Sequence, residues 1–330
     1  MKQYLTPKLL ALFVGIMFLL LWFIAFLWSF EPDTFSPRQV ATEQSQLRNE
    51  KIVAGYTITT SLITVTETIL NKSGGYLSND VLPPSLFMDN IPSWEFGALE
   101  MIRDLALAMR KDFSRSQSQS SENIFLTEAQ PKLNIDHRNW LLPSAESQYQ
   151  GAIDKLIEYR SSLSNNQATS GQFYARADNL RDWLKQAEKR LGNLSQKLST
   201  SVGQERLDTS LAGDVEATQS TPSNPLLQNK ANWWKLDENF YEARGASWAL
   251  LHFLKAVEVD FGDVLRKKNA LVSVQQIIRE LESTQEAVWS PMILNGSGFG
   301  MLANHSLVMA NYISRANAAL IELSELLNQG

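Results

Sequence analysis

The sequence predicts an all-α protein, in which one N-terminal transmembrane helix precedes a bundle of long antiparallel helices. Two observations predict this class. Residues 9–30 form an apolar run without a charged side chain, and most later segments repeat apolar residues at spacings of three and four, the period of a helix with one buried face. The expected order is a tail (1–8), an anchor (9–30), a first helical half (31–199), a disordered loop (200–229) and C-terminal helices (230–330).

The apolar run from Leu9 to Phe30 is long enough to span a membrane. As a helix it rises about 33 Å at roughly 1.5 Å per residue, whereas the hydrocarbon core of a bilayer is about 30 Å thick. Trp22 and Trp28 lie in its second half, where interfacial aromatic residues are expected. A cleaved signal peptide is the alternative, but its apolar run is usually about 7 to 15 residues and precedes an A-x-A-like site, which this sequence lacks. We therefore expect an uncleaved anchor.

The charges around the anchor predict its orientation. Lys2 and Lys8 precede the run, whereas Glu31 and Asp33 follow it, and positive charge is retained on the cytosolic side. In a bacterium, this places the N-terminus in the cytosol and the main domain in the periplasm, as a single-pass inner-membrane protein. The chain has no cysteine, so neither a disulfide nor a lipid-modified cysteine is expected.

The exported part is mildly acidic. Of the 30 Lys and Arg residues two precede residue 31, whereas all 35 Asp and Glu residues lie from residue 31 onward, so residues 31–330 carry a formal charge of −7. Nucleic-acid-binding domains carry basic patches, and we therefore expect no nucleic-acid partner. A chain of about 300 residues is long enough to bury one or two cores.

Four helices are expected before residue 200. Residues 40–70 place Ile58, Leu62, Val65 and Ile69 on one stripe, although their many threonines would also suit a strand. A Gly-Gly pair ends this element, and an irregular, proline-containing connection follows. The other helices are expected from Trp94 to about Asp112 with Ser93 as N-cap, from about Ser144 to Ser164, and from Gly171 to Leu198.

Residues 200–229 lose both the helical period and the aromatic residues. Polar, proline-containing segments rarely bury enough apolar surface to fold, so we expect a disordered loop that divides the domain into two halves. The polar segment 114–121 is expected to be a solvated joint.

Two apolar stripes predict an antiparallel helical hairpin near the C-terminus. One stripe spans residues 271–288 and the other spans residues 302–327, each with alternating spacings of four and three. Pro291 is expected to end the first helix, and Met301 to start the second after a short connection.

The glycine-rich turn "NGSGFGMLANHS" between these helices has the composition of a phosphate-binding loop but not its pattern. A Walker-type loop continues with Lys and then Ser or Thr after its last glycine, whereas Met and Leu follow here. No Lys or Arg lies between residues 280 and 314 to balance an anion. We therefore expect a turn and no nucleotide, with a positive φ at Gly296, Gly298 or Gly300 and with Phe299 turned inward.

The sequence lacks the usual metal and catalytic motifs. None of its three histidines belongs to an H-E-x-x-H or E-x-x-H pattern, and no G-x-S-x-G nucleophile motif lies on a strand. His252, within an apolar helix, is expected to be a hydrogen-bonded interior residue, and His305, beside Asn304, a residue of a helix cap. No metal and no cofactor is expected.

The strongest polar cluster is "NWWKLDENFYEARGASW". Glu238 and Glu242, at i and i+4, lie on one side of the predicted helix, where like charges need partners. Lys235 is a local partner for Glu238, whereas Arg244 meets Asp237 only across two turns or through a third group. An inter-helix salt-bridge network is the expected interpretation. The alternative is a functional carboxylate site, with Asp237 and Arg244 as its ligand-binding candidates.

A second acidic group begins with Glu95, on the helix predicted from Trp94. Glycosidases use two carboxylates across one cleft, about 5 to 9.5 Å apart. Glu95 with Glu238 or Glu242 would supply such a pair if the two helices face each other. These three glutamates are therefore the catalytic candidates of an alternative function, an envelope (cell-wall) hydrolase.

The stretches "GGYLSNDVLPPSLFMDNIPSWEFG", "SRSQSQS", "FYEARGASWAL" and "SPMILNGSGFGMLANHSLVMANYISRANAA" resemble an uncharacterised bacterial family catalogued as domain of unknown function 2333. The resemblance covers nearly the whole exported chain. It implies a bacterial, inner-membrane-anchored protein of similar layout, and it adds no catalytic residue.

The anchor, the helical repeats and the lack of a coherent catalytic constellation together predict a membrane-anchored protein rather than an enzyme. Its domain is expected to bind a protein or another component of the cell envelope, and self-association stays open. Residues 1–8 are too few for a cytosolic output domain, so a transmembrane receptor of the usual kind is not expected. The envelope hydrolase remains the alternative.

Overall fold

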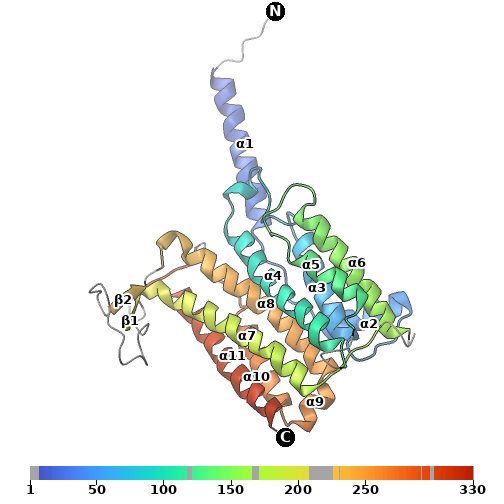
Figure 1. Ribbon diagram of the computed structural model, residues 1–330. Helices are drawn as coiled ribbons and strands as arrows, with labels where there is room; N and C mark the ends of the chain where they lie inside the picture. The colour runs from blue at the N-terminus through green and yellow to red at the C-terminus, as the bar shows by residue number, and fades with distance from the viewer. Residues whose placement is uncertain are drawn as a thin grey trace, which may run out of the picture.

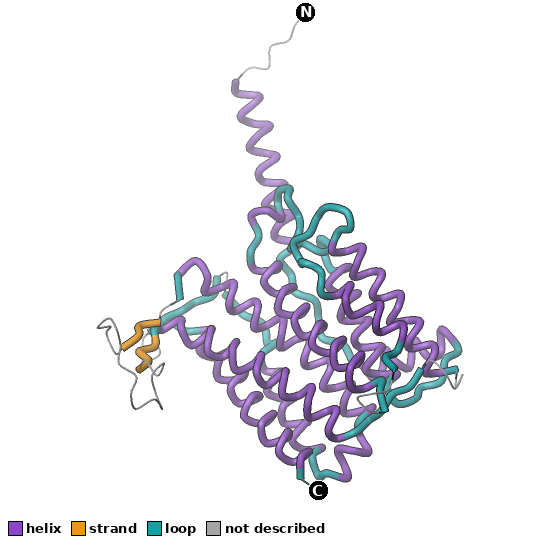
Figure 2. The backbone as a smooth tube through the Cα atoms, in the orientation of Figure 1, coloured by secondary structure: helices purple, strands orange, loops and turns teal. Residues whose placement is uncertain are grey.

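The computed structural model describes residues 7–116, 121–165, 171–207, 226–229, 231–290, 292–297 and 301–329. These residues are helical apart from loops and one pair of short strands, which confirms the predicted all-α class. Figure 1 shows α1 projecting from one end of a bundle, with the C-terminus at the opposite end. The loops gather largely at these two ends (Figure 2).

The helices differ widely in length, and short 3-10 or π segments accompany several of them. The α-helices are α1 (Pro7–Trp28), α2 (Pro37–Arg48), α3 (Tyr56–Asn71), α4 (Asn90–Ala108), α5 (Ile124–Leu133), α6 (Ala145–Ser164), α7 (Ala177–Ser199), α8 (Leu236–Asp260), α9 (Gly262–Lys267), α10 (Leu271–Ser283) and α11 (His305–Asn328). The shorter elements are η1 (Ser85–Phe87), η2 (Met109–Phe113, a π-helix), η3 (Thr200–Val202), η4 (Trp233–Lys235), β1 (Gln204–Leu207) and β2 (Leu226–Asn229).

Helix α1 is long and apolar enough to cross a membrane. Its most apolar 18-residue window has a mean hydropathy of 2.9, and none of its residues is fully buried in the protein. The helix spans Pro7–Trp28, so the expected segment 9–30 is shifted by two residues. Ser29 leaves the helix, and its hydroxyl donates to the Ala25 carbonyl oxygen at 2.7 Å, which satisfies one acceptor at the helix end.

The threonine-rich segment forms helix α3 and not a strand. Four of its hydroxyls donate to the carbonyl oxygen four residues earlier, at distances of 2.6 to 2.8 Å. Each of these polar side chains therefore has a partner inside the bundle, so the buried helix tolerates it. The helix starts at Tyr56, later than the expected position 40, because residues 49–55 form a turn after the separate helix α2.

Helix α4 starts earlier than the sequence predicts. It begins at Asn90, so Ser93 is not its N-cap but lies inside the first turn, where its hydroxyl donates to the Asp89 carbonyl oxygen at 2.8 Å. Pro92 belongs to this turn, and a first helical turn accepts proline because its N–H groups have no partner within the helix.

The C-terminal helices are antiparallel, as expected, but the connection between them is long. Lys268 before α10 contacts the Gln329 carbonyl oxygen after α11, and Glu280 pairs with Arg315 at 2.6 Å. Helix α10 ends at Ser283 and not near Pro291, and α11 starts at His305 and not at Met301. Its start is set by the N-cap Asn304, whose side-chain oxygen accepts from the Leu307 N–H at 2.9 Å.

Part of the segment expected to be disordered has regular structure. Thr200–Val202 continue α7 as η3, and β1 pairs with β2 in an antiparallel ladder from Gln204 opposite Asn229 to Leu207 opposite Leu226. Main-chain hydrogen bonds form such a ladder irrespective of how polar its side chains are, so composition alone misjudged these ends. The remainder of the expected loop, residues 208–225, lies outside the described residues, as do residues 117–120 of the expected joint.

Helices α4 and α8 cross at the centre of the bundle, where glycines let their backbones touch. An added Cβ at Gly97 would overlap the carbonyl oxygen of Glu242, and one at Gly245 would overlap that of Trp94. The buried Trp94 and Trp248 rings pack beside this crossing, with centroids 5.0 Å apart. The crossing joins the two halves of the chain, and a single hydrophobic core spans both.

Replacing Gly245 with Ala should destabilise the protein by about 1–3 kcal/mol, because the new methyl group must push α4 away. The matched control is Gly192→Ala in α7, where the nearest side-chain atom to an added Cβ is 3.6 Å away. This control should stabilise the protein by up to about 1 kcal/mol through helix propensity. Denaturant titration of the full chain in detergent, followed by circular dichroism, measures both changes. Equal effects of the two substitutions would contradict the close crossing.

Candidate functional site

Glu95, the first catalytic candidate, is sealed inside the bundle and paired. It is fully buried on α4 and forms an ion pair with Lys72 at 2.7 Å. Its carboxylate also accepts hydrogen bonds from the main-chain N–H groups of Leu77 (2.9 Å) and Ser78 (2.8 Å). Burial raises the pKa of Glu95, and the Lys72 charge opposes this shift. Glu95 therefore holds the turn after α3 in place and does not meet solvent.

The other two catalytic candidates lie at the surface, apart from Glu95. Glu238 and Glu242 line an open groove to which Glu95 does not contribute. Glu242 is paired with Lys197 of α7, whose Nζ lies 2.7 Å from one carboxylate oxygen. The structure therefore does not assemble these glutamates as two carboxylates facing across one cleft, which glycoside hydrolysis requires.

The two ligand-binding candidates also separate. Asp237 lies in the first turn of α8, and its carboxylate accepts from the Glu238 N–H at 3.1 Å, where the helix dipole favours an anion. Arg244 turns instead to Glu31, to whose carboxylate its Nε donates at 2.5 Å. These residues are 213 positions apart, so no local pattern in the sequence connects them.

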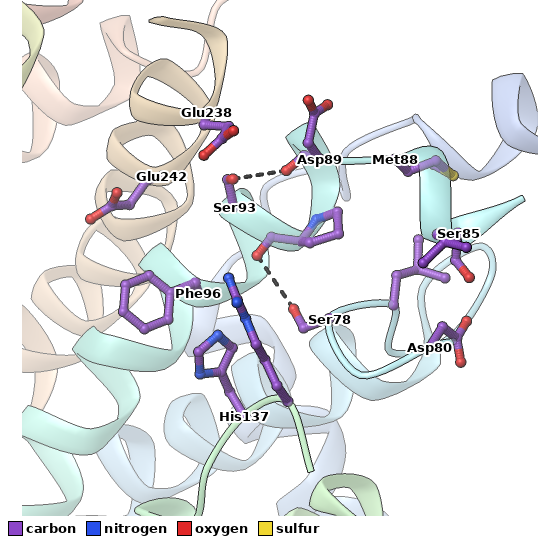
Figure 3. A pocket seen from close by; sticks show the side chains of 14 residues that line it. Ser78, Asp80, Ser85, Met88, Asp89, Ser93, Phe96, His137, Glu238 and Glu242 are labelled. Atoms are coloured by element: carbon purple, nitrogen blue, oxygen red, sulfur yellow. Dashed lines mark hydrogen bonds between the residues drawn. The ribbon is translucent and has the colours of Figure 1, made fainter. Parts of the chain in front are cut away.

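A groove with a volume of about 540 Å³ opens near the end of the bundle from which α1 emerges. Its walls come from the loop that precedes α4, from α4 itself, from the start of α8 and from the loop between α5 and α6. In Figure 3, Glu238 and Glu242 lie on one side of Ser93, and Asp80 and Ser85 lie on the other.

Carboxylates dominate the charge of this groove. Asp80, Asp89, Glu238 and Glu242 line it, against the single guanidinium of Arg138. Within the described residues, Glu242 is the only one of the four carboxylates with a basic group within 4.0 Å. The groove therefore offers three carboxylates that a positively charged ligand would neutralise without breaking an existing ion pair.

The groove also has an aromatic wall. The His137 and Phe96 rings lie 4.8 Å apart between centroids, and the Tyr76 hydroxyl fixes the His137 loop by donating to its carbonyl oxygen at 3.0 Å. Burial lowers the pKa of His137, so the imidazole is neutral at pH 7. In the described part of the chain, no group of three or more His, Asp and Glu side chains is arranged to hold a metal ion.

Sequence patterns did not single out Asp80, Asp89 or His137 as groove residues. Their loops meet through Asn79, whose side-chain amide donates to the Asn139 carbonyl oxygen at 3.0 Å and to a carboxylate of α6 at 2.8 Å. Contacts between irregular segments have no period along the chain, so no signal in the sequence announces them.

A second cluster, the linker clamp, holds the segment that follows α1. The clamp consists of Arg244, Trp248 and His252 on one face of α8, and the held segment is residues 31–35. Besides Glu31, the Arg244 guanidinium donates to the carbonyl oxygens of the three residues that follow α10, at 2.8 to 3.2 Å. Arg244 thus joins the end of α10 to the start of the linker.

The other two clamp residues hold the linker through its backbone. The Trp248 indole N–H donates to the Asp33 carbonyl oxygen at 3.3 Å. Nε2 of His252 accepts from the Phe35 N–H at 3.0 Å, and Nδ1 lies 2.7 Å from the Trp248 carbonyl oxygen. This pattern requires a neutral imidazole with its proton on Nδ1. It agrees with the expected interior role of His252, which is fully buried and stacked on the Phe35 ring.

The glycine-rich turn is closed by backbone pairing. Gly296 N–H donates to the Ala303 carbonyl oxygen at 3.0 Å, and His305 N–H donates to that of Leu294 at 2.8 Å. Gly296 does not have a positive φ; it is required because an added Cβ would overlap the Leu302 carbonyl oxygen. Gly298, Phe299 and Gly300 lie outside the described residues. Met292, at the start of this turn, is exposed.

A protein-family model described as "Uncharacterized protein conserved in bacteria (DUF2333)" matches residues 2–330, essentially the whole chain. This match confirms the resemblance seen in the sequence. No curated protein and no solved structure matches the chain.

His252 should make stability depend on pH. Burial lowers its pKa from 6.5 to about 3, so the folded state keeps it neutral while the unfolded chain takes up a proton below pH 6.5. The stability from neutral His252 is complete above pH 6.5 and falls by about 1.4 kcal/mol per pH unit towards pH 3. Between pH 5 and pH 6.5 the wild type should therefore gain about 2 kcal/mol relative to His252→Gln.

Asp260 provides the opposite control. Burial raises its pKa from 3.8 to about 7. The folded state therefore keeps this carboxyl protonated while the unfolded chain releases the proton, and the free energy of unfolding falls as pH rises from 3.8 to 7. Asp260→Asn should therefore gain stability relative to the wild type over the same interval. Denaturant titrations at pH 5 and pH 6.5 compare the three proteins, and an unchanged pH dependence in His252→Gln would contradict the neutral, buried histidine.

Proposed function

We propose that this chain, which belongs to the bacterial DUF2333 family, is a single-pass inner-membrane protein whose periplasmic helical domain binds a basic segment of an envelope protein. The observation that carries the proposal is the groove of about 540 Å³, in which Asp80, Asp89 and Glu238 have no basic partner among the described residues. It lies at the end of the domain nearest the anchor.

Contacts between α1 and the domain support a retained anchor. The Ser73 hydroxyl donates to the Leu27 carbonyl oxygen at 3.1 Å, and the Trp28 ring packs on Gly74, where an added Cβ would be 2.7 Å from the ring. A signal sequence is discarded after export and gains nothing from such packing. Lys2 and Lys8 before the helix, with Glu31 and Asp33 after it, support a cytosolic N-terminus.

The chemistry of the groove favours a cationic, partly apolar ligand. The carboxylates attract Lys or Arg side chains, and the wall formed by Phe96 and His137 accepts their aliphatic stems or a neighbouring aromatic ring. A peptide segment fits this combination, because it carries charged and apolar side chains on one backbone. An envelope hydrolase gains no comparable support, since Glu95 is buried and paired with Lys72.

An alkaline phosphatase fusion after residue 60 should be active, because that enzyme folds with its disulfides in the oxidising periplasm. A fusion after residue 8, which ends before the anchor, should be inactive and serves as the control. The intact mass of the membrane-extracted chain should include α1. An inactive fusion after residue 60, or a chain shortened by the length of α1, would contradict the proposed topology.

Charge reversal in the groove should weaken the binding of a basic peptide. The probe is a fluorescent Lys- and Arg-rich peptide, titrated against the full chain in phosphatidylcholine nanodiscs. Asp89→Lys combined with Glu238→Lys should raise its Kd by about tenfold or more, because each surface ion pair contributes up to about 1 kcal/mol.

The matched control makes the same change in net charge at the opposite end of the bundle. Asp263 and Glu322 are exposed there on α9 and α11, and changing both to Lys should leave the Kd nearly unaltered at 0.15 M salt, where charges beyond about 8 Å are screened. Equal weakening by both double variants would show that the peptide follows net charge and not the groove, and would refute the proposed site.

A further inference from the structure

We infer that two apolar loops beside α1 insert into the same bilayer as the anchor, so that the domain is seated on the membrane and not merely tethered to it. This inference rests on the proposed membrane anchoring by α1. The seating surface consists of Val81, Leu82, Leu86 and Phe87 on the loop around η1, and Trp140, Leu141 and Leu142 on the loop between α5 and α6.

These side chains are unusually exposed for apolar residues. The exposed fractions are 72% for Leu82, 80% for Phe87 and 98% for Leu142, and Trp140 is 55% exposed. Both loops lie at the end of the bundle where α1 emerges (Figure 1). Large exposed apolar side chains that gather at one end of a protein are typical of a contact with a partner or a membrane.

The level of the first loop along α1 identifies the membrane as the occupant. A cleft beside the anchor is lined by Trp22, Ala25 and Phe26 of α1 on one side and by Phe87 and Met88 on the other. From Trp22 to the helix end at Trp28 the rise is about 9 Å at 1.5 Å per residue. Phe87 therefore lies level with the last two turns of the anchor, within the depth that a spanning helix occupies.

The exposed fractions of the side chains along α1 also indicate that part of the domain lies beside its last turns. Leu21, Ile24, Ala25 and Trp28 are half-buried, whereas their neighbours on the other faces of the helix are mostly exposed. These four residues form one stripe at spacings of three, one and three, the pattern of a helix face covered by a neighbour. Part of the domain therefore accompanies α1 for two turns below its end, and a bilayer that surrounds those turns also meets that part.

The chemistry of the loops suits the interface of a bilayer. Residues 81–88 and 139–143 contain no charged side chain, and Trp140 is of the residue type enriched at this depth. Insertion also requires internal partners for backbone groups. Around η1, Phe87 N–H donates to the Pro84 carbonyl oxygen at 3.0 Å and Met88 N–H to that of Ser85 at 2.9 Å.

The charged groups near the loops place the water boundary and exclude an electrostatic mechanism. Asp80 and Asp89 flank the first loop, and both are exposed. Asp89 also lines the cleft beside Trp22 and Phe26 of α1, so it sets the aqueous edge of the seating surface at the last turns of α1, and both aspartates repel anionic headgroups. Membrane contact is therefore apolar, and zwitterionic lipid suffices for it. The acidic groove, which these two aspartates also line, then opens at the membrane surface and meets partners that lie along it.

The experiment uses the full chain, whose lack of cysteine allows single labels. Phe87→Cys and Leu142→Cys carry an environment-sensitive nitrobenzoxadiazole dye, in phosphatidylcholine nanodiscs with or without nitroxide-labelled lipid. Both dyes should show blue-shifted emission and lose most of it to the nitroxide. Adding phosphatidylglycerol to the nanodiscs should not increase the quenching.

Two further labels make the result decisive. Val272→Cys lies in the first turn of α10, next to the Lys268 contact with Gln329 at the C-terminal end, and is 73% exposed; it should emit as in water and resist quenching. Phe18→Cys in the middle of α1 should be quenched strongly if the anchor spans the bilayer. Quenching at position 18 without quenching at 87 and 142 would refute the seating surface and leave the anchor intact. Lack of quenching at position 18 would refute the anchor and, with it, this inference. Matched circular dichroism melting curves establish that each variant is folded.

Discussion

The Arg244 guanidinium connects three parts of the molecule: the segment after α1, the central helix α8 and the end of α10. The relative position of these parts depends on the contacts of this one side chain. Arg244 is nearly buried, and its donors are used on the Glu31 carboxylate and on three main-chain carbonyl oxygens. A buried ion pair gains little over apolar packing, but removing one partner leaves an uncompensated charge inside the protein. The arrangement is therefore suited to fixing one geometry more than to adding stability. Burial raises the pKa of Glu31 while Arg244 opposes that shift, so the two charges depend on each other.

The contacts that begin at Arg244 continue through α8 and α4 to both ends of the domain. One turn further along α8, Trp248 holds the linker and packs on Trp94 of α4, and the glycine crossing at Gly97 and Gly245 leaves no space for the two helices to slide. The position of α4 in turn places Glu95, which binds Lys72 and the turn after α3. That turn touches the last residues of α1 through Ser73. The anchor is thus held on two sides, by the linker clamp and by the α3–α4 turn, and its direction relative to the bundle follows from packed contacts.

How much of this was predictable depends on whether a residue interacts locally or across the bundle. The apolar helix α1, the stripes of α10 and α11 and the interior position of His252 follow from period and composition, which are properties of neighbouring residues. Arg244 has no pattern that points to Glu31, and Glu95 has none that points to Lys72, because only the packed helices bring these pairs together. The same limit applies to the end of α10, where the carbonyl groups that follow the helix accept from a side chain of α8. The polar composition of residues 200–229 also did not predict β1 and β2, because main-chain hydrogen bonds form that ladder.

The acidic residues of the chain fall into two physical classes, and this division separates structure from candidate function. Glu95 is fully buried, Glu31 and Asp260 are partly buried, and burial raises the pKa of each of them. The Glu95 and Asp260 carboxylates accept hydrogen bonds from the protein itself. Glu31 pairs with Arg244 through one oxygen, whereas its Oε1 is buried without a hydrogen-bond partner. Asp80, Asp89 and Glu238 lie in the groove without a basic partner among the described residues. Asp80 and Asp89 are exposed and Glu238 is half-buried, and burial also raises the pKa of Asp80. An exposed carboxylate costs little when unpaired, and it binds an incoming cation without a large desolvation penalty. Glu95, which sequence patterns proposed as a catalytic acid, is therefore the carboxylate least able to react. The carboxylates without a basic partner among the described residues come largely from irregular loops next to α1. Function in this fold is to be sought at the loops beside α1, because there the helices leave side chains uncommitted.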